Sequence, residues 1–227
     1  LIATRPEEEQ NLASCAELVR AANSNGGSNL LTELISKLPY DHPARMNYKS
    51  IEIAPEKTYS SILSTLQSKL RKFDSKEIAE LTSTDTINFE DIGNKKTAVY
   101  VISSDTHTAY DFLLTIFFSQ MIQQLYDYAD QNGGKLKERT YFILDEFANI
   151  GRIPDFDKKI STSRSRGISF SVILQNVDQL EAVYEKSYET IIGNCDTHVF
   201  LGSNSYKTVE YFSKALGEKT IERDSIS

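Results

Sequence analysis

The sequence predicts an α/β fold with a partial, mainly parallel sheet, preceded by an all-α domain. Residues 1–86 carry apolar positions at helical spacing and no strand-like run. From about residue 87, short apolar runs alternate with longer helical stretches, which is the pattern of parallel strands joined by right-handed crossovers. These short runs are continuously apolar, which is typical of strands buried on both faces.

The first domain, residues 1–86, is predicted to be a helical bundle. Apolar positions repeat from Leu12 to Val19, and Asn25-Gly26-Gly27 ends that helix. A short helix is predicted over 30–38, and Pro55 opens a longer one. The apolar stripe of that longer helix is formed by Ile62, Leu66, Leu70 and Phe73.

The second domain, residues 87–227, is predicted to contain the sheet. Its expected strands are 97–102, 141–144, 168–174 and 198–201, with a weaker one at 219–222. Its expected helices are 110–130, 155–166, 177–184, 188–192 and 206–216. Both domains mix acidic and basic residues, so the boundary near residue 86 rests on periodicity alone.

The charge balance argues against a dedicated nucleic-acid coat protein. The net charge is −7 and the sequence pI about 5.1, whereas such proteins carry a basic excess. No apolar run reaches the roughly eighteen residues that predict a membrane span, and no signal peptide opens the sequence. We therefore expect this piece to be soluble and cytoplasmic.

The sharpest motif is an apolar run, 140–144, followed directly by the acidic pair Asp145 and Glu146. In open parallel sheets, ligands bind at the carboxyl ends of the strands, where this run delivers its two carboxylates. A phosphate-loop ATPase uses such a pair, the first acid to hold Mg²⁺ through water and the second to polarise the attacking water. The same pattern also serves as a turn and helix cap, and taken alone it does not separate the two interpretations.

The spacing downstream favours the ATPase interpretation. The next predicted strand ends at Gln175, which a parallel sheet places at the same edge as Asp145 and Glu146. A glutamine there can contact a γ-phosphate or orient water. Arg164 and Arg166 end the intervening helix, where they could reach a neighbouring subunit's nucleotide or simply compensate the helix dipole.

Several segments together resemble the TraG/TraD-like coupling proteins of type IV secretion, which are conjugation ATPases. The resemblance runs from about residue 50 to the end and is most specific over 140–202. The matching segments are 97–100, 117–120, 144–154, 156–159, 163–169, 174–175 and 193–197.

This resemblance implies a RecA-like motor that forms a hexameric ring at the cytoplasmic side of the membrane and moves single-stranded DNA and relaxase substrates into the secretion channel. It implies that Asp145 and Glu146 are the Walker B acids, with Asp145 ordering Mg²⁺ and Glu146 taking part in catalysis, and that Arg164 is the arginine finger. Gln175 matches a glutamine that contacts nucleotide and takes part in catalysis. Residues 1–86 match, by position, an all-α domain involved in substrate recognition, so relaxosome proteins are its expected partners.

The sequence departs from the family in one respect: it contains no G-x-x-x-x-G-K-[ST] phosphate loop. The pair Gly134-Lys135 lacks the earlier glycine and is followed by Leu136. We therefore expect ATP and Mg²⁺ in the parent protein but neither bound by this piece. Two alternatives stay open, namely a motor piece of another RecA-like DNA translocase and a non-enzymatic adaptor that docks a relaxase.

Overall fold

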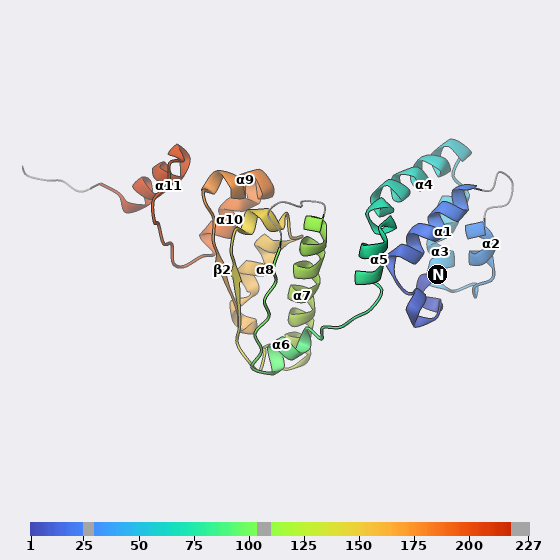
Figure 1. Ribbon diagram of the computed structural model, residues 1–227, viewed down its shortest axis with the longest axis horizontal. Helices are drawn as coiled ribbons and strands as arrows, with labels where there is room; N and C mark the ends of the chain where they lie inside the picture. The colour runs from blue at the N-terminus through green and yellow to red at the C-terminus, as the bar shows by residue number, and fades with distance from the viewer. Residues whose placement is uncertain (25–29, 104–109, 219–227) are drawn as a thin grey trace, which may run out of the picture. The chain divides into compact units, whose positions relative to one another are not determined.

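The computed structural model describes residues 1–24, 30–103 and 110–218, and the chain divides into two compact units, Leu1–Ile87 and Asn88–Ser227 (Figure 1). The weak strand predicted at 219–222 lies outside the described residues.

Every element that the structure describes in the first unit is a helix. They are α1 (Leu12–Ser24), α2 (Leu30–Ser36), α3 (Pro43–Glu52), α4 (Glu56–Leu70) and α5 (Lys76–Leu81), with 3₁₀ helices η1 (Ile2–Thr4), η2 (Glu7–Glu9) and η3 (Arg71–Asp74). The sequence prediction missed α3. Its start is fixed by Pro43 at the first helical position and by the His42 ring, which accepts a hydrogen bond from the Ala44 N–H at 3.1 Å.

A small apolar core joins α1 to α4 in this unit. Val19 and Ala22 of α1 pack with Leu63 of α4, and Leu31, Tyr59 and Leu70 pack around them. The predicted stripe on α4 was partly wrong, because Ile62 and Leu66 are exposed while Leu63 is buried. The buried face is thus centred about one position away from the predicted one.

The second unit contains the sheet and a larger core. Its elements are α6 (Glu90–Asn94), α7 (Asp111–Gln131), β1 (Thr140–Leu144), η5 (Phe147–Ile150), α8 (Phe156–Thr162), η6 (Arg164–Arg166), β2 (Ile168–Val172), α9 (Val177–Tyr184), η7 (Glu185–Ser187), α10 (Tyr188–Gly193) and α11 (Tyr206–Leu216) (Figure 1). The strands pair in parallel, with Thr140 opposite Ile168 and Leu144 opposite Val172. The predicted parallel pairing of these two strands is confirmed.

One face of this two-stranded sheet is buried. Phe142 and Leu144 of β1 belong to a core that includes side chains of α7, α8, α9 and α10. Phe142 stacks on its cross-strand neighbour Phe170 with ring centroids 5.0 Å apart. On the other face of β1, Tyr141 and Ile143 are 65% and 73% exposed, so the expected burial on both faces is not found within the described residues.

The other two predicted strands that lie in described residues, 97–102 and 198–201, are not strands in this structure. Both segments are exposed along their whole length. A strand exists through hydrogen bonds to a neighbouring strand, and the sheet in the described part of the chain joins β1 to β2 without either run. Apolar composition alone was therefore an insufficient signal for them. None of the described helices combines the length and apolar character that crossing a bilayer requires.

Candidate active site

The acidic pair Asp145 and Glu146 emerges from the carboxyl end of β1. The hydrogen-bond ladder continues past the strand, because Ile173 N–H donates to the Leu144 carbonyl at 3.0 Å and Phe147 N–H donates to the Ile173 carbonyl at 3.1 Å. These two bonds bracket the acidic pair and hold it against the segment that follows β2. Both carboxylates are exposed.

Glu146 makes the turn from strand to 3₁₀ helix. Its backbone is left-handed, with φ 47° and ψ 46°, a conformation uncommon for a residue with a side chain. The turn is closed by Asn149 N–H, which donates to the Glu146 carbonyl at 2.8 Å. Phe147 within this turn and Ile150 directly after it are buried and anchor it in the core. Unusual backbone held by surrounding packing is frequent at functional sites.

Amide groups surround the Glu146 carboxylate. Oε1 accepts from Gln175 Nε2 at 3.0 Å, and Oε2 accepts from Asn149 Nδ2 at 2.6 Å. The neighbouring carboxylate of Asp145 accepts from the Glu146 backbone N–H at 3.1 Å through Oδ1. Both acids are exposed to solvent, and the Glu146 carboxylate is held in a defined direction by the two amides.

Gln175 reaches Glu146 from the segment after β2. Its Oε1 accepts from Gln179 Nε2 at 3.5 Å, and α9 begins beside it with Asn176 as N-cap, whose side chain accepts from the Gln179 N–H. The parallel pairing thus brings Glu146 and Gln175 to one sheet edge, where the sequence analysis expected them. Their roles in catalysis stay predictions.

The two arginines of η6 lie at the opposite end of β2. Arg166 forms a bidentate pair with Asp130 of α7 at 2.9 and 3.0 Å and lies over the Tyr126 ring, 4.7 Å from its centroid. Arg164 is exposed. Five strand residues at about 3.3 Å each separate η6 from the edge that carries Glu146, so the structure does not bring Arg164 to the carboxylates of its own chain.

The end of η5 and the loop after it are each fixed by a hydrogen bond to a helix. Thr115 of α7 donates from Oγ1 to the Ile150 carbonyl at 2.6 Å, and the Tyr184 hydroxyl of α9 accepts from the Ile153 N–H at 3.1 Å. Tyr184 is 2% exposed, and its burial raises its pKa to about 12, partly opposed by the Ile153 N–H. This support reaches the acidic pair through Phe147, which stacks on Tyr184 at 5.5 Å.

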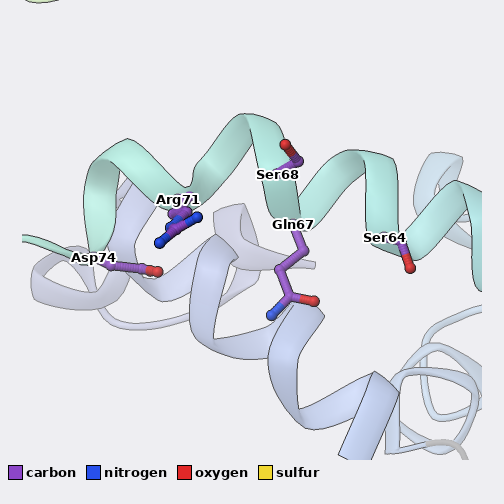
Figure 2. Close-up of a pocket in the computed structure, with 5 residues that line it drawn as sticks. All are labelled: Ser64, Gln67, Ser68, Arg71 and Asp74. Carbon is purple, nitrogen blue, oxygen red and sulfur yellow. The ribbon is translucent and has the colours of Figure 1, made fainter.

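Asn149 is the site residue that the sequence analysis did not single out. Its signal is weak, since an asparagine three residues after a glutamate contacts it only when the chain forms this turn. The first unit has a pocket of its own. It has a volume of about 340 Å³ and is lined by Ser64, Gln67, Ser68, Arg71 and Asp74 (Figure 2). Of these, Asp74 is paired with Arg20 at 2.9 Å.

Comparison with known proteins shows that this chain is similar to conjugation proteins. The model of the family described as Type IV secretory system Conjugative DNA transfer matches residues 2–227. The chain is 24% identical to conjugal transfer protein TraG of Escherichia coli over 205 residues, covering 83% of this chain and 32% of the relative.

Two further relatives agree with this. Protein VirD4 of Rhizobium rhizogenes is 27% identical over 151 residues, covering 64% of this chain and 22% of the relative. Coupling protein TraD of Escherichia coli strain K12 is 26% identical over 118 residues, covering 52% and 16%. The chain thus spans a third or less of the length of these curated relatives.

Proposed function

Because the chain belongs to the type IV secretory system conjugative DNA transfer family, we propose that it is part of an ATP-driven coupling protein. In this proposal the complete protein recruits relaxase-bound DNA and moves it into a type IV secretion channel. The observation that carries the motor role is the 3.0 Å hydrogen bond between Gln175 and Glu146 at the carboxyl edge of two parallel strands. A nucleotide site at this edge follows the general rule for ligands in such sheets.

The residues at this edge have the chemistry that ATP hydrolysis needs. Asp145 is an exposed carboxylate, the kind of oxygen ligand that Mg²⁺ prefers, directly or through water. Bound Mg²⁺ would supply positive charge that neutralises the phosphates. Glu146 would accept a proton from the attacking water, and Gln175 would exchange its bond to Glu146 for a contact with the γ-phosphate.

The rest of the nucleotide site has to come from other residues. The sequence lacks a phosphate loop, so a backbone cradle for the phosphates would be supplied by another segment of a longer protein. Arg164, exposed and remote from Glu146 of its own chain, would reach the nucleotide of the neighbouring subunit in a hexameric ring. Single-stranded DNA would pass through that ring.

The first unit would serve recruitment. It is a set of helices with its own core. Every described element in it is a helix, so among the described residues it has no strand that could deliver an acidic pair like that of the second unit. We propose that it binds a relaxase or an accessory protein more tightly than DNA. Pull-downs with the full-length protein, which includes residues 1–87, test this proposal. Capture of DNA without a protein partner would reverse the proposed preference for a protein partner over DNA.

The motor role is tested by replacing the two acids with their amides in the full-length protein. Glu146→Gln keeps size and removes the charge, so ATP should still bind while turnover falls about a hundredfold or more, the scale of a general base. Asp145→Asn should in addition weaken Mg²⁺-dependent binding. Exposed Glu189 is a control, since Glu189→Gln should leave turnover unchanged. Normal turnover with Glu146→Gln would refute the proposed site.

A further inference from the structure

We propose that Asn149 is a positioning residue that fixes the Glu146 carboxylate for water activation. This inference rests on the proposed ATPase function. Its basis is the shorter of the two side-chain hydrogen bonds to the Glu146 carboxylate, Asn149 Nδ2 to Oε2 at 2.6 Å, which is at the short limit for an N–H donor and a charged oxygen acceptor.

The direction of this amide follows from chemistry. An ionised carboxylate only accepts hydrogen bonds, so the NH₂ group of each amide has to face Glu146. One oxygen is then held by Asn149 and the other by Gln175. Each carboxylate oxygen has a further lone pair, so a water molecule can still donate to Glu146 while both amides are in place.

The two amides hold Glu146 in different ways. Asn149 belongs to the same turn, and its backbone N–H donates to the Glu146 carbonyl at 2.8 Å, so backbone and side chain both bind Glu146. The turn itself is anchored by buried Phe147 and Ile150. Gln175 comes from the segment after β2, and its other contact, to Gln179, is long at 3.5 Å. Asn149 is therefore the fixed donor and Gln175 the exchangeable one.

A fixed donor matters because Glu146 is exposed. A free glutamate side chain populates several rotamers, and fixing one of them costs conformational entropy. When Gln175 turns to the γ-phosphate, Glu146 loses one of its two donors. Asn149 then keeps the remaining oxygen in place, so that the general base enters the reaction already oriented.

The test is a double-mutant cycle in the full-length protein. Asn149→Ala should lower kcat by about tenfold, the scale of one hydrogen bond to a charged group, with KM and ATP affinity unchanged. In a Glu146→Gln background the same change should cause no further loss, because the group that it positions is gone. The matched control is Asn132→Ala, which removes another exposed amide, one that donates to the Tyr128 carbonyl at 2.7 Å, and should change neither constant.

A second variant separates positioning from general damage to the turn. Asn149→Asp keeps the shape of the side chain, removes the donor and adds a repelling charge, so its kcat should fall further than that of Asn149→Ala. Equal losses from Asn149→Ala in both backgrounds, or a raised KM without a change in kcat, would overturn the positioning role. If Glu146→Gln slows hydrolysis and both Asn149 variants do not, this inference alone fails. If Glu146→Gln has no effect, the proposed function fails with it.

Discussion

The Tyr184 hydroxyl accepts a hydrogen bond from the backbone N–H of Ile153 at 3.1 Å, and both residues are buried, at 2% and 0% exposure. This bond ties α9 to the loop that leaves the acidic turn. The N–H sits in an apolar setting, because Tyr184 lies against the rings of Phe147 and Phe156. Within these surroundings the hydroxyl is what satisfies a buried polar group of the main chain.

Removing the hydroxyl should therefore destabilise the second unit. Tyr184→Phe keeps the ring packing but leaves the Ile153 N–H buried without an acceptor, which costs about 1–3 kcal/mol. Urea denaturation measures this change in the free energy of unfolding. Tyr141→Phe, at an exposed position of β1, is the matched control and should be close to neutral. Equal stability of the Tyr184→Phe variant and the unaltered protein would show that another group takes over the N–H.

The same tyrosine predicts a loss of stability at alkaline pH. Burial raises its pKa to about 12 in the folded protein, whereas an unfolded tyrosine has a pKa of about 10. Because the folded state keeps the proton longer, its stabilising contribution is complete below about pH 10 and is lost as the pH rises towards 12. Unfolding free energies at pH 9 and 11 should thus differ less for Tyr184→Phe than for the unaltered protein. An identical pH dependence would contradict this assignment.

Gly151 should resist replacement more than Gly134, which also has a positive φ. Its φ is +83°, and a Cβ there would lie 2.9 Å from Thr115 Oγ1, the atom that donates to the Ile150 carbonyl. Gly134 has φ +85° with nothing within 4 Å of its Cβ position, so it reports the strain of a positive φ without a clash. Gly134→Ala should cost about 1–2 kcal/mol, and Gly151→Ala about 1–3 kcal/mol more. Comparable melting temperatures of the two variants would argue against the clash.

The 227-residue chain by itself should hardly bind or hydrolyse ATP. Its acidic pair is present, but no phosphate-loop motif stands in the sequence to grip the β- and γ-phosphates. Isothermal titration with ATP and Mg²⁺ measures the affinity directly. Binding in the low micromolar range or tighter would show that these residues form a complete nucleotide site, and would remove the need for a cradle from elsewhere.

Arg164 should act across a subunit boundary in the assembled protein. Arg164→Ala should leave nucleotide affinity of a single subunit nearly unchanged and abolish hydrolysis stimulated by ring formation, because its proposed target lies on a neighbour. Arg166→Ala is a useful contrast, since it breaks the pair with Asp130 and should reduce stability instead.

Mixed rings provide the direct measurement for Arg164. Subunits with Arg164→Ala and subunits with Glu146→Gln are each inactive, but an interface that joins the intact Glu146 of one to the intact Arg164 of the other should recover activity. If hydrolysis is not recovered in rings of confirmed mixed composition, Arg164 does not act on the neighbouring nucleotide and only compensates the helix dipole.

The predicted strands that the structure contains and the predicted strands that it does not contain differ in one physical respect. β1 and β2 are close in the chain and joined by a single helical crossover, so apolar character and spacing sufficed to predict their parallel pairing. The segments 97–102 and 198–201 are equally apolar, yet a strand also needs a hydrogen-bonding neighbour, which composition does not specify.

The same distinction holds at the candidate site. Gln175 and Glu146 could be placed together because parallel strands end at a common edge. Asn149 could not be placed there, because its contact depends on the left-handed backbone of Glu146. A glycine at that position would have predicted such a turn, but the sequence has a glutamate. Arg164 was recognised by its position in a motif, and the structure adds that it lies at the opposite end of β2 from the edge that carries Asp145 and Glu146.

The exposed face of β1 should make the second unit prone to association in solution. Tyr141 and Ile143 present adjacent apolar surface to water, and β1 and β2 pair only with each other among the described residues. Exposed apolar surface next to unpaired strand edges favours binding to general chaperones in a cell and association with other copies of the protein in vitro. The time for which the second unit stays in solution should therefore shorten as its concentration rises. Mild detergent should lengthen this time, because association of folded copies, and not unfolding, is expected to limit it.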